Sequence, residues 1–265
     1  MEIIHPNISH NRIRVAIFDF DGTLSLLRSG WTQIMHALMF GELNRTPRHE
    51  DTTVLDAFIT DLIYSTSGQQ TIYQMMRLAE EVSNRGGMPD TPQEYLRIFT
   101  EELLARVNER IIAIESGANT PADWLVPGAL EFLQALAARG ITCYIVSGTG
   151  EDFVRDEAAL LGIAPYFAGI FGAHADYKNH SKKIVIGKLV AQHALQPGEL
   201  VTFGDGAPEI ADTKAVGGIG VGLATDEEKR AGIHPQKRAV LVQAGADAIV
   251  PDFSECAALT AYLFG

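Results

Sequence analysis

Short apolar runs that end abruptly at Asp, Ser or Gly constrain the fold of this chain more than any other feature. They occupy residues 14–18, 141–146, 200–203, 219–223 and 248–250. Near-continuous apolar runs of this length are typical of strands buried on both faces, and such strands form parallel sheets covered by helices. Stretches with helical spacing separate most of the runs. The sequence therefore predicts an α/β fold with a doubly wound parallel sheet.

Two of the helices between these runs can be delimited from their end signals. Residues 127–139 carry apolar side chains at helical spacing, with Pro127 at the start and Gly140 as the stop. Residues 181–194 follow the same spacing, and the hydroxyl of Ser181 can cap the first turn. Both helices are expected to cover a face of the sheet.

The segment between residues 28 and 123 follows a different pattern, because helical spacing dominates it and strand signals are weak. Helices are expected at residues 31–43, 53–64, 71–82 and 92–114. Pro121 and Pro127 mark the return to the strand-rich pattern. The sequence therefore predicts an α/β core domain formed by residues 1–27 and 124–265. An all-helical domain, residues 28–123, is inserted after its first strand.

Composition narrows the classes of protein to which the chain can belong. Its 265 residues carry a formal net charge of −12, which disfavours binding to nucleic acid or to anionic membranes. No apolar run approaches the roughly 20 residues of a membrane-spanning helix, and the N-terminal residues lack the apolar segment of a secretory signal. With only two cysteines, Cys143 and Cys256, we expect no disulfide and a cytoplasmic location. The oligomeric state stays open.

The most informative polar segment is D-F-D-G-T-L at residues 19–24, directly after the first apolar run. Two carboxylates about 4 Å apart repel by roughly 4 kcal/mol at an effective dielectric constant near 20, so such a pair needs a cation or a proton. An ordinary Asp-Gly turn would explain Asp21 and Gly22 but gives no reason for Asp19. We therefore interpret the segment as functional.

Two further groups offer hydroxyls, amides and positive charge to an anion. S-G-T-G at residues 147–150 follows an apolar run, where a hydroxyl and free N–H groups can hold an anion, although a plain helix cap explains it equally well. Lys182 and Lys183 begin a helix, where the helix dipole disfavours a cation and a compensating anion is implied. We assign the active role to Lys182, with Lys183 as the alternative.

The remaining acidic group follows the run at residues 200–203. Asp205 ends this strand, and Glu209 lies one turn into the next helix. Carboxylate ligands without nearby His or Cys suit Mg²⁺ far better than Zn²⁺. Because ligands bind at the carboxyl ends of parallel strands, we expect both residues to lie near Asp19. Asp212 is expected to face solvent.

These polar groups stand in the order of the four motifs of the haloacid dehalogenase-like (HAD) hydrolase superfamily, which the chain resembles. The matching residues are D-F-D-G-T at 19–23, Ser147, Lys182 or Lys183, and Gly204-Asp205 with Glu209. The resemblance covers roughly residues 12–26 and 124–252. It implies a Rossmann-like core, and the helical insert resembles the cap of the C1 subclass. Glu209 stands where Asp is commoner.

The resemblance implies a Mg²⁺-dependent phosphatase that acts on a small phosphate ester. Asp19 would be the nucleophile, and Asp21 the general acid and base. The implied metal ligands are Asp19, the backbone carbonyl of Asp21, Asp205 and, through water, Glu209. The implied phosphate-binding residues are Ser147, Gly148, Gly22 and Thr23, together with Lys182. Members that cleave other bonds lack an acid two residues after the nucleophile, so Asp21 favours phosphate esters.

The helical insert is expected to supply substrate specificity. Arg28, Trp31 and Gln69 are the candidate contacts to the substrate, although Trp31 could equally pack in the core of the insert. A sugar phosphate is our hypothesis for the substrate. The polar loop at residues 65–70 could hold such a polyol, but a solvated turn explains it as well. Weaker candidates are His174, Asp176 and Tyr177.

Three other functions compete with this interpretation. A phosphomutase of the β-phosphoglucomutase type would use the same residues, and no motif separates the two activities. A pseudoenzyme that only binds a phosphorylated metabolite is conceivable, although every expected catalytic position is filled. A phospho-acceptor receiver domain is disfavoured, because its acceptor Asp follows a central strand of a much shorter chain.

Overall fold

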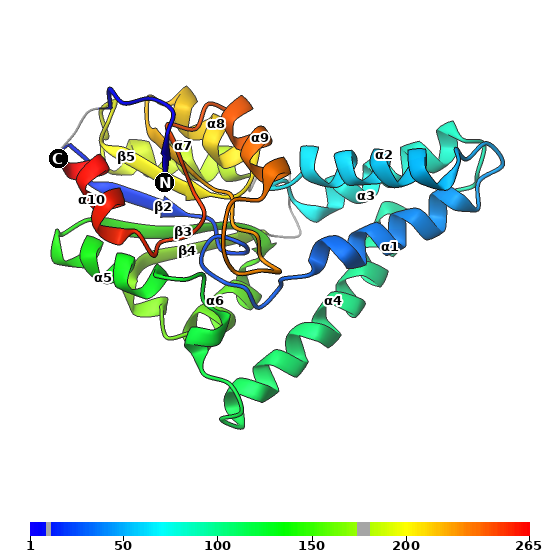
Figure 1. Cartoon of the computed structure of the whole chain (residues 1–265), viewed down its shortest axis with the longest axis horizontal. Coiled ribbons are helices and arrows are strands. Elements are labelled where there is room, and N and C mark those ends of the chain that lie inside the picture. The colour runs from blue at the N-terminus through cyan, green and yellow to red at the C-terminus, as the bar shows by residue number, and fades with distance from the viewer. Residues whose placement is uncertain (9–11, 174–180) are drawn as a thin grey trace.

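The computed structural model describes residues 1–8, 12–173 and 181–265, and its described strands form one sheet (Figure 1). The strands are β1 (Glu2–Ile3), β2 (Val15–Phe18), β3 (Thr142–Gly150), β4 (Phe167–Ala173), β5 (Leu200–Gly204), β6 (Ile219–Leu223) and β7 (Ala248–Val250). Their order is β1-β7-β6-β5-β2-β3-β4. β1 pairs antiparallel with β7, and the other described neighbours are parallel. This arrangement confirms the predicted fold class.

The first strand of the parallel set lies in the middle of the sheet, with β3 on one side and β5 on the other. Phe18, the last residue of β2, is in register with Ile145 of β3 and with Phe203 of β5. The three strands therefore reach the same edge side by side. This register brings the polar residues that follow each apolar run to one place.

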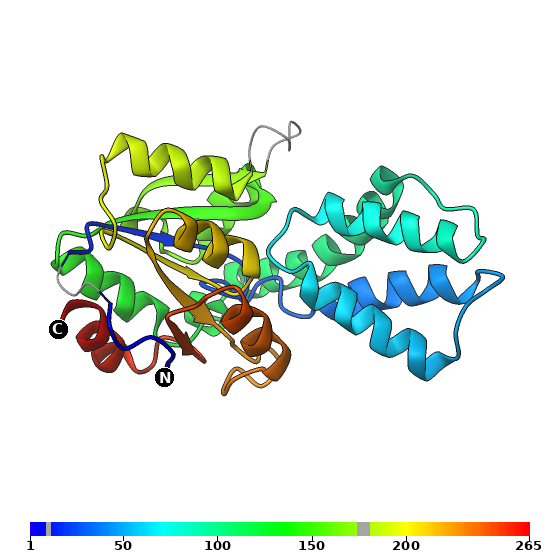
Figure 2. The same cartoon turned by 90° about the horizontal axis from the view of Figure 1, so that it is seen from above.

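Helices cover both faces of the sheet (Figures 1 and 2). One face packs against α5 (Ala129–Ala138), α6 (Glu151–Leu160) and α10 (Cys256–Phe264) through the largest hydrophobic cluster. The other face packs against α7 (Lys182–Gln192), α8 (Ala207–Ala215) and α9 (Pro235–Gln243). Two short 3₁₀ helices, η1 (Pro121–Trp124) and η2 (Ala164–Tyr166), complete the described elements. In the described part of the chain, no helix is both long and apolar enough to cross a membrane.

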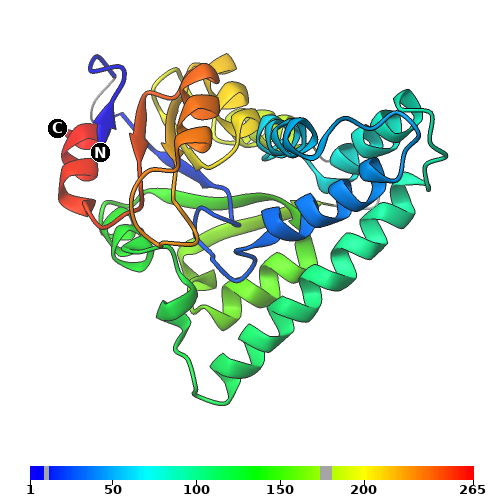
Figure 3. The same ribbon diagram turned by 45° about the vertical axis from the view of Figure 1, so that its right-hand side comes forward.

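Four helices between β2 and β3 form the inserted cap domain (Figure 3). They are α1 (Trp31–Asn44), α2 (Thr52–Ser65), α3 (Thr71–Asn84) and α4 (Pro92–Glu115). Capping fixes two of the starts, because Asp51 accepts from the N–H groups of Thr53 and Val54, and Thr91 caps a helix whose first residue is Pro92. The helices enclose their own hydrophobic cluster, separate from the clusters under the sheet. The exact division at residues 27/28 and 123/124 stays a prediction.

The structure also corrects parts of the prediction. β3 continues past its predicted end at Val146, because a register shift lets Gly150 pair with Ala173 of β4. The helix expected from Pro127 begins at Ala129, since Gly128 adopts φ +74° and breaks the helical path. β1 and β4 were not predicted. Cys143 and Cys256 are both free.

Candidate active site

Asp19 follows β2 directly, and its side chain is buried at the carboxyl edge of the sheet. Its N–H donates to the carbonyl of Phe203 at 2.9 Å, which extends the strand pairing. Its Oδ1 accepts from the N–H of Phe20 at 2.8 Å. Gly22 turns the chain with φ +72°, and a Cβ there would lie 2.4 Å from Oδ2 of Asp205. The glycine therefore lets the turn after Asp19 approach a second carboxylate closely.

Asp21 lies between hydrogen-bonding and charged partners at the edge of the same site. Thr149 donates its hydroxyl to Oδ2 at 2.7 Å, and Nε of Arg28 lies 3.5 Å from Oδ1. Arg28 is itself ion-paired with the buried Glu157 of α6. Burial raises the pKa of Asp21 to about 6, against the opposing effect of Arg28. A carboxyl group with such a pKa can both give and accept a proton near neutral pH.

Three buried carboxylates gather beside this turn. Oxygen atoms of Asp19, Asp205 and Glu209 all lie within 4.8 Å of one another. Glu209 reaches back from α8, where its Oε1 accepts from the N–H of Gly206 at 2.8 Å. Burial raises the pKa of Asp19 to about 6 and that of Glu209 to about 8, against the opposing effect of Lys182, and the neighbouring carboxylates add to the rise. A set of hard oxygen donors with this excess of negative charge fits a divalent cation.

Lys182 provides positive charge at the cluster. Its Nζ lies 3.0 Å from Oδ2 of Asp19 and 3.2 Å from Oε2 of Glu209, and its side chain is buried. Burial alone would lower the pKa of Lys182, but the two carboxylates outweigh that effect and raise it. Ser181 caps α7 and so places the lysine at the start of the helix. Lys183, the alternative, is exposed.

The end of β3 forms another wall of the site. Ser147 is buried, and its Oγ accepts from the N–H of Thr149 at 3.0 Å. Gly148 faces the cap, where a Cβ would lie 3.4 Å from the carbonyl oxygen of Gln69. The missing side chain at residue 148 therefore leaves room between core and cap.

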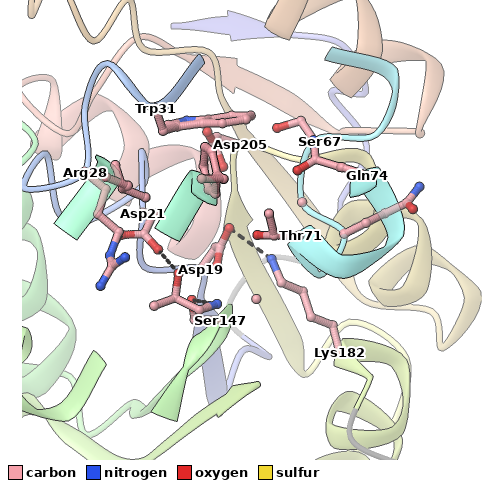
Figure 4. A pocket seen from close by; sticks show the side chains of 16 residues that line it. Asp19, Asp21, Arg28, Trp31, Ser67, Thr71, Gln74, Ser147, Lys182 and Asp205 are labelled. Atoms are coloured by element: carbon pink, nitrogen blue, oxygen red, sulfur yellow. Dashed lines mark hydrogen bonds and ion pairs between the residues drawn. The ribbon is translucent and has the colours of Figure 1, made fainter. Parts of the chain in front are cut away.

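These groups surround a cavity of about 90 Å³ (Figure 4). From the core it is lined by Asp19, Asp21, Ser147, Gly148, Thr149, Lys182 and Asp205, and from the linker and cap by Arg28, Trp31, Ser67, Gly68, Gln69, Thr71, Gln74, Phe99 and Leu103. Figure 4 shows the labelled side chains of both domains around the same space, with Asp19 linked to Lys182. A buried carboxylate and a lysine of the core therefore line the same space as several cap side chains.

The predicted site residues have different places in this arrangement. Arg28, Trp31 and Gln69, the three candidates from the linker and insert, all line the cavity. Within the described lining, Gly22 and Thr23 do not appear: Gly22 faces Asp205, and the side chain of Thr23 is fully buried. His174, Asp176 and Tyr177 lie outside the described residues.

A family model described as "Hydrolase: haloacid dehalogenase-like hydrolase" matches residues 13–217, a range that contains the turn at Asp19, Ser147, Lys182 and the acidic pair at 205 and 209. The chain belongs to the haloacid dehalogenase-like hydrolases. Two phosphoglycolate phosphatases of Vibrio vulnificus, from strains YJ016 and CMCP6, are 28% and 27% identical to it over 125 residues. The match covers 47% of this chain and 55% of each relative, so the chain spans about half the length of the curated relatives it matches.

Solved structures of HAD-like proteins share the fold of this hydrolase over nearly its whole length. A predicted phosphoglycolate phosphatase from Haemophilus somnus superposes with a TM-score of 0.62 at 18% identity, covering 95% of this chain and all of that one. A putative β-phosphoglucomutase from Bacteroides vulgatus gives 0.59 at 17% identity, covering 96% and 92%. At these identities the likeness establishes the fold, including the cap.

Two buried ionic contacts of this HAD-like site were not found by sequence reasoning. Lys237 of α9 lies 2.7 Å from Asp205, and Glu157 of α6 holds Arg28. Lys237 and Glu157 both lie on helices that are distant in sequence from the residues they contact. No rule of sequence spacing predicts either contact. Thr149 belongs to the S-G-T-G segment at residues 147–150, but no sequence pattern indicated its hydrogen bond to Asp21.

Proposed function

We propose that this chain is a Mg²⁺-dependent phosphatase that hydrolyses a small phosphorylated metabolite through an aspartyl-phosphate on Asp19. The observation that carries the proposal is that Asp19, Lys182 and Asp205 line one cavity between core and cap, with Glu209 in contact with Lys182. The family match and the names of the Vibrio relatives support the same chemistry. We assign the cap to residues 28–123 and the cellular location to the cytoplasm.

We assign the attack on phosphorus to Asp19, because its carboxylate is oriented by the N–H of Phe20 and by Lys182 and lines the cavity. The attack forms an acyl phosphate that water then hydrolyses, so one difficult displacement becomes two easier ones. Lys182 is placed to bind the phosphoryl oxygens, as are Ser147 and Gly148. Gly22 and Thr23 would contribute to phosphate binding indirectly, by fixing the shape of the turn that follows Asp19.

Asp21 is the proposed general acid and base. Protonated, it would give its proton to the leaving alkoxide, and as the carboxylate it would then take a proton from the attacking water. Its raised pKa supports this role, because it leaves the carboxyl group able to exchange a proton near neutral pH. The Thr149 hydroxyl lowers that pKa but fixes the orientation of the carboxyl group by donating to it. A bound Mg²⁺ would neutralise charge between nucleophile and phosphoryl group. Its proposed ligands are Asp19, the Asp21 carbonyl, Asp205 and, through water, Glu209.

The test is release of inorganic phosphate from a panel of phosphorylated sugars, polyols and small acids, measured with Mg²⁺ and again with EDTA. We expect Mg²⁺-dependent release that the Asp19→Asn variant abolishes. Near wild-type release by that variant would overturn the proposed nucleophile. Isomerised sugar phosphate without phosphate release would instead make the protein a phosphomutase, and tight binding of esters without any turnover would make it a pseudoenzyme.

A further inference from the structure

A second and larger cavity adjoins the one above Asp19. Its volume is about 390 Å³, which is about four times that of the inner cavity of about 90 Å³. The residues that line both spaces are Arg28, Thr71, Phe99, Leu103, Gly148 and Thr149. Because the two spaces share these walls, the outer cavity lies next to the space in which a phosphoryl group would reach Asp19. The inner cavity suits a phosphoryl group, and the outer one has the size of cavities that bind a whole small molecule.

Five large apolar side chains from the two domains line the outer cavity. They are Ile72, Leu96, Phe99 and Leu103 of the cap and Phe153 of the core. Phe153 is the most exposed of them (46%), in the first turn of α6 at the boundary with the cap. Apart from Arg28, the described polar side chains between them are neutral amides and hydroxyls, among them Gln93 and Thr100. An aromatic ring left this exposed beside a cavity is suited to contact an apolar ligand.

Charge in the outer cavity disfavours an acidic leaving group. Among the described residues that line it, Arg28 is the one cationic side chain. The guanidinium already faces two carboxyl groups, those of Glu157 and Asp21, so its positive charge is shared with them. It also lies over the Phe153 ring, 5.5 Å from the centroid. The carboxylate of a leaving group placed there would lose its hydration without gaining an unpaired cation as partner. This desolvation costs binding free energy.

On these grounds we propose that the leaving group is an uncharged alcohol with an aromatic or branched apolar body, which lies between Phe153 of the core and Phe99 and Leu103 of the cap. This inference rests on the proposed phosphatase activity and specifies its substrate class. On this proposal, a short acidic ester such as phosphoglycolate is a poor substrate for this chain. The phosphate ester of an alcohol with an apolar face is also a better substrate than that of a fully hydroxylated sugar.

The test compares phosphate esters of primary alcohols, so that the leaving groups differ in body and not greatly in intrinsic reactivity. The full chain with Mg²⁺ is assayed on 2-phenylethyl phosphate, 3-methylbutyl phosphate, ribose 5-phosphate, ethyl phosphate and phosphoglycolate. We expect kcat/KM for the first two to exceed that for phosphoglycolate by at least about tenfold, the usual scale for filling an apolar site. The kcat/KM for ribose 5-phosphate should lie between the values for these two esters and the value for phosphoglycolate. A preference of the same size for phosphoglycolate or ribose 5-phosphate would overturn the inference.

The Phe153→Ala variant tests the contact itself. Since this side chain is half exposed, its removal should leave the fold intact. We expect the ratio of kcat/KM for 2-phenylethyl phosphate to that for ethyl phosphate to fall about tenfold. The matched control is Ile112→Ala, which removes an exposed apolar side chain of α4 (61% exposed) outside the lining of both cavities. An unchanged ratio in Phe153→Ala would contradict the assignment.

The outcomes separate the two proposals. If no ester in the panel releases phosphate in the presence of Mg²⁺, the proposed phosphatase activity fails. If the esters are hydrolysed at rates that do not depend on the body of the alcohol, the phosphatase activity stands and the inferred substrate class fails.

Discussion

The ammonium nitrogen of Lys237 lies 2.7 Å from Oδ2 of Asp205, inside the core. It also lies 2.6 Å from Oε1 of Glu227, so the lysine bridges two carboxylates. Burial alone would lower the pKa of Lys237, but Asp205 and Glu227 outweigh it and raise the pKa. A second buried cation, in addition to Lys182, therefore offsets part of the negative charge of the acidic site.

Replacing Lys237 by Met is expected to lower the free energy of unfolding by about 3–5 kcal/mol in the presence of a chelator, because Asp205 then stays buried without its cation. Mg²⁺ is expected to recover part of this loss, since a cation bound only by the folded protein stabilises it. Urea unfolding in EDTA and in Mg²⁺, followed by circular dichroism, measures both effects.

Lys229→Met is the matched control for this prediction. Its ion pair with Asp226 has a similar distance, 2.6 Å, but the lysine side chain is 78% exposed. Asp226 is only 12% exposed, but it also accepts from the backbone N–H of Lys229 at 3.1 Å, a bond that the substitution keeps. Pairs that face solvent contribute about 0–1 kcal/mol, so the control should lose less stability than Lys237→Met. Equal losses in both variants would contradict the role given to Lys237.

Asp21→Asn is expected to slow phosphate release by roughly 10²–10⁴, the usual contribution of a general acid, while leaving substrate binding largely intact. Steady-state kcat and KM on an alkyl phosphate measure the two effects separately. Asp212→Asn, a partly buried carboxyl of α8 outside the cavity lining, is the control and should retain activity. If Asp21→Asn turns over at the wild-type rate, another group is the acid.

The sequence allowed the sheet and the centre of the candidate site to be predicted because one geometric rule links them. In a parallel sheet the strand ends meet at one edge, so Asp19, Ser147 and Asp205 could be placed together without knowledge of the packing. The same reasoning could not find β4, whose F-A-G-I-F-G-A sequence includes two glycines and alternates in burial at the edge of the sheet. β1 has only two residues, too few for any pattern.

Contacts between helices and loops follow no such rule. Arg28 was predicted to contact substrate from its position near the hinge, and it does line the cavity. Its ion pair with Glu157, 129 residues away, depends on how α6 packs beside the linker. A glutamate in a helix is most often solvated, so neither Glu157 nor Lys237 differs in sequence from an ordinary surface residue.

Glu157→Ala is expected to lower the free energy of unfolding by about 3–5 kcal/mol, because Arg28 and Glu157 are both buried and the substitution leaves the arginine with only Asp21. Chemical denaturation measures the change. Glu94→Ala provides the comparison, since its pair with Arg97 is exposed and contributes little. A loss in Glu157→Ala no larger than in Glu94→Ala would show that the buried pair does not stabilise the linker.

His234 links the core to the cap, and its titration should make stability depend on pH. Its Nε2 lies 3.2 Å from the hydroxyl of Tyr64 in α2, and the two rings stack with centroids 5.1 Å apart. Its Nδ1 is buried without a hydrogen-bond partner among the described residues. Burial lowers the pKa of His234, and the positive charge of Lys237 adds to this effect, against Asp226 and Glu227.

A histidine whose pKa is lower in the folded state than its ordinary value of about 6.5 binds its proton first in the unfolded state. The stability that neutral His234 contributes is therefore present above pH 6.5 and is lost as the pH falls through the folded pKa. Between pH 7.5 and 5, wild type should lose more free energy of unfolding than His234→Gln, which has no titrating ring. Urea unfolding at each pH provides the comparison. Parallel pH profiles for the two proteins would mean that protonation of His234 costs the fold nothing and that the contact with Tyr64 accommodates the charged ring.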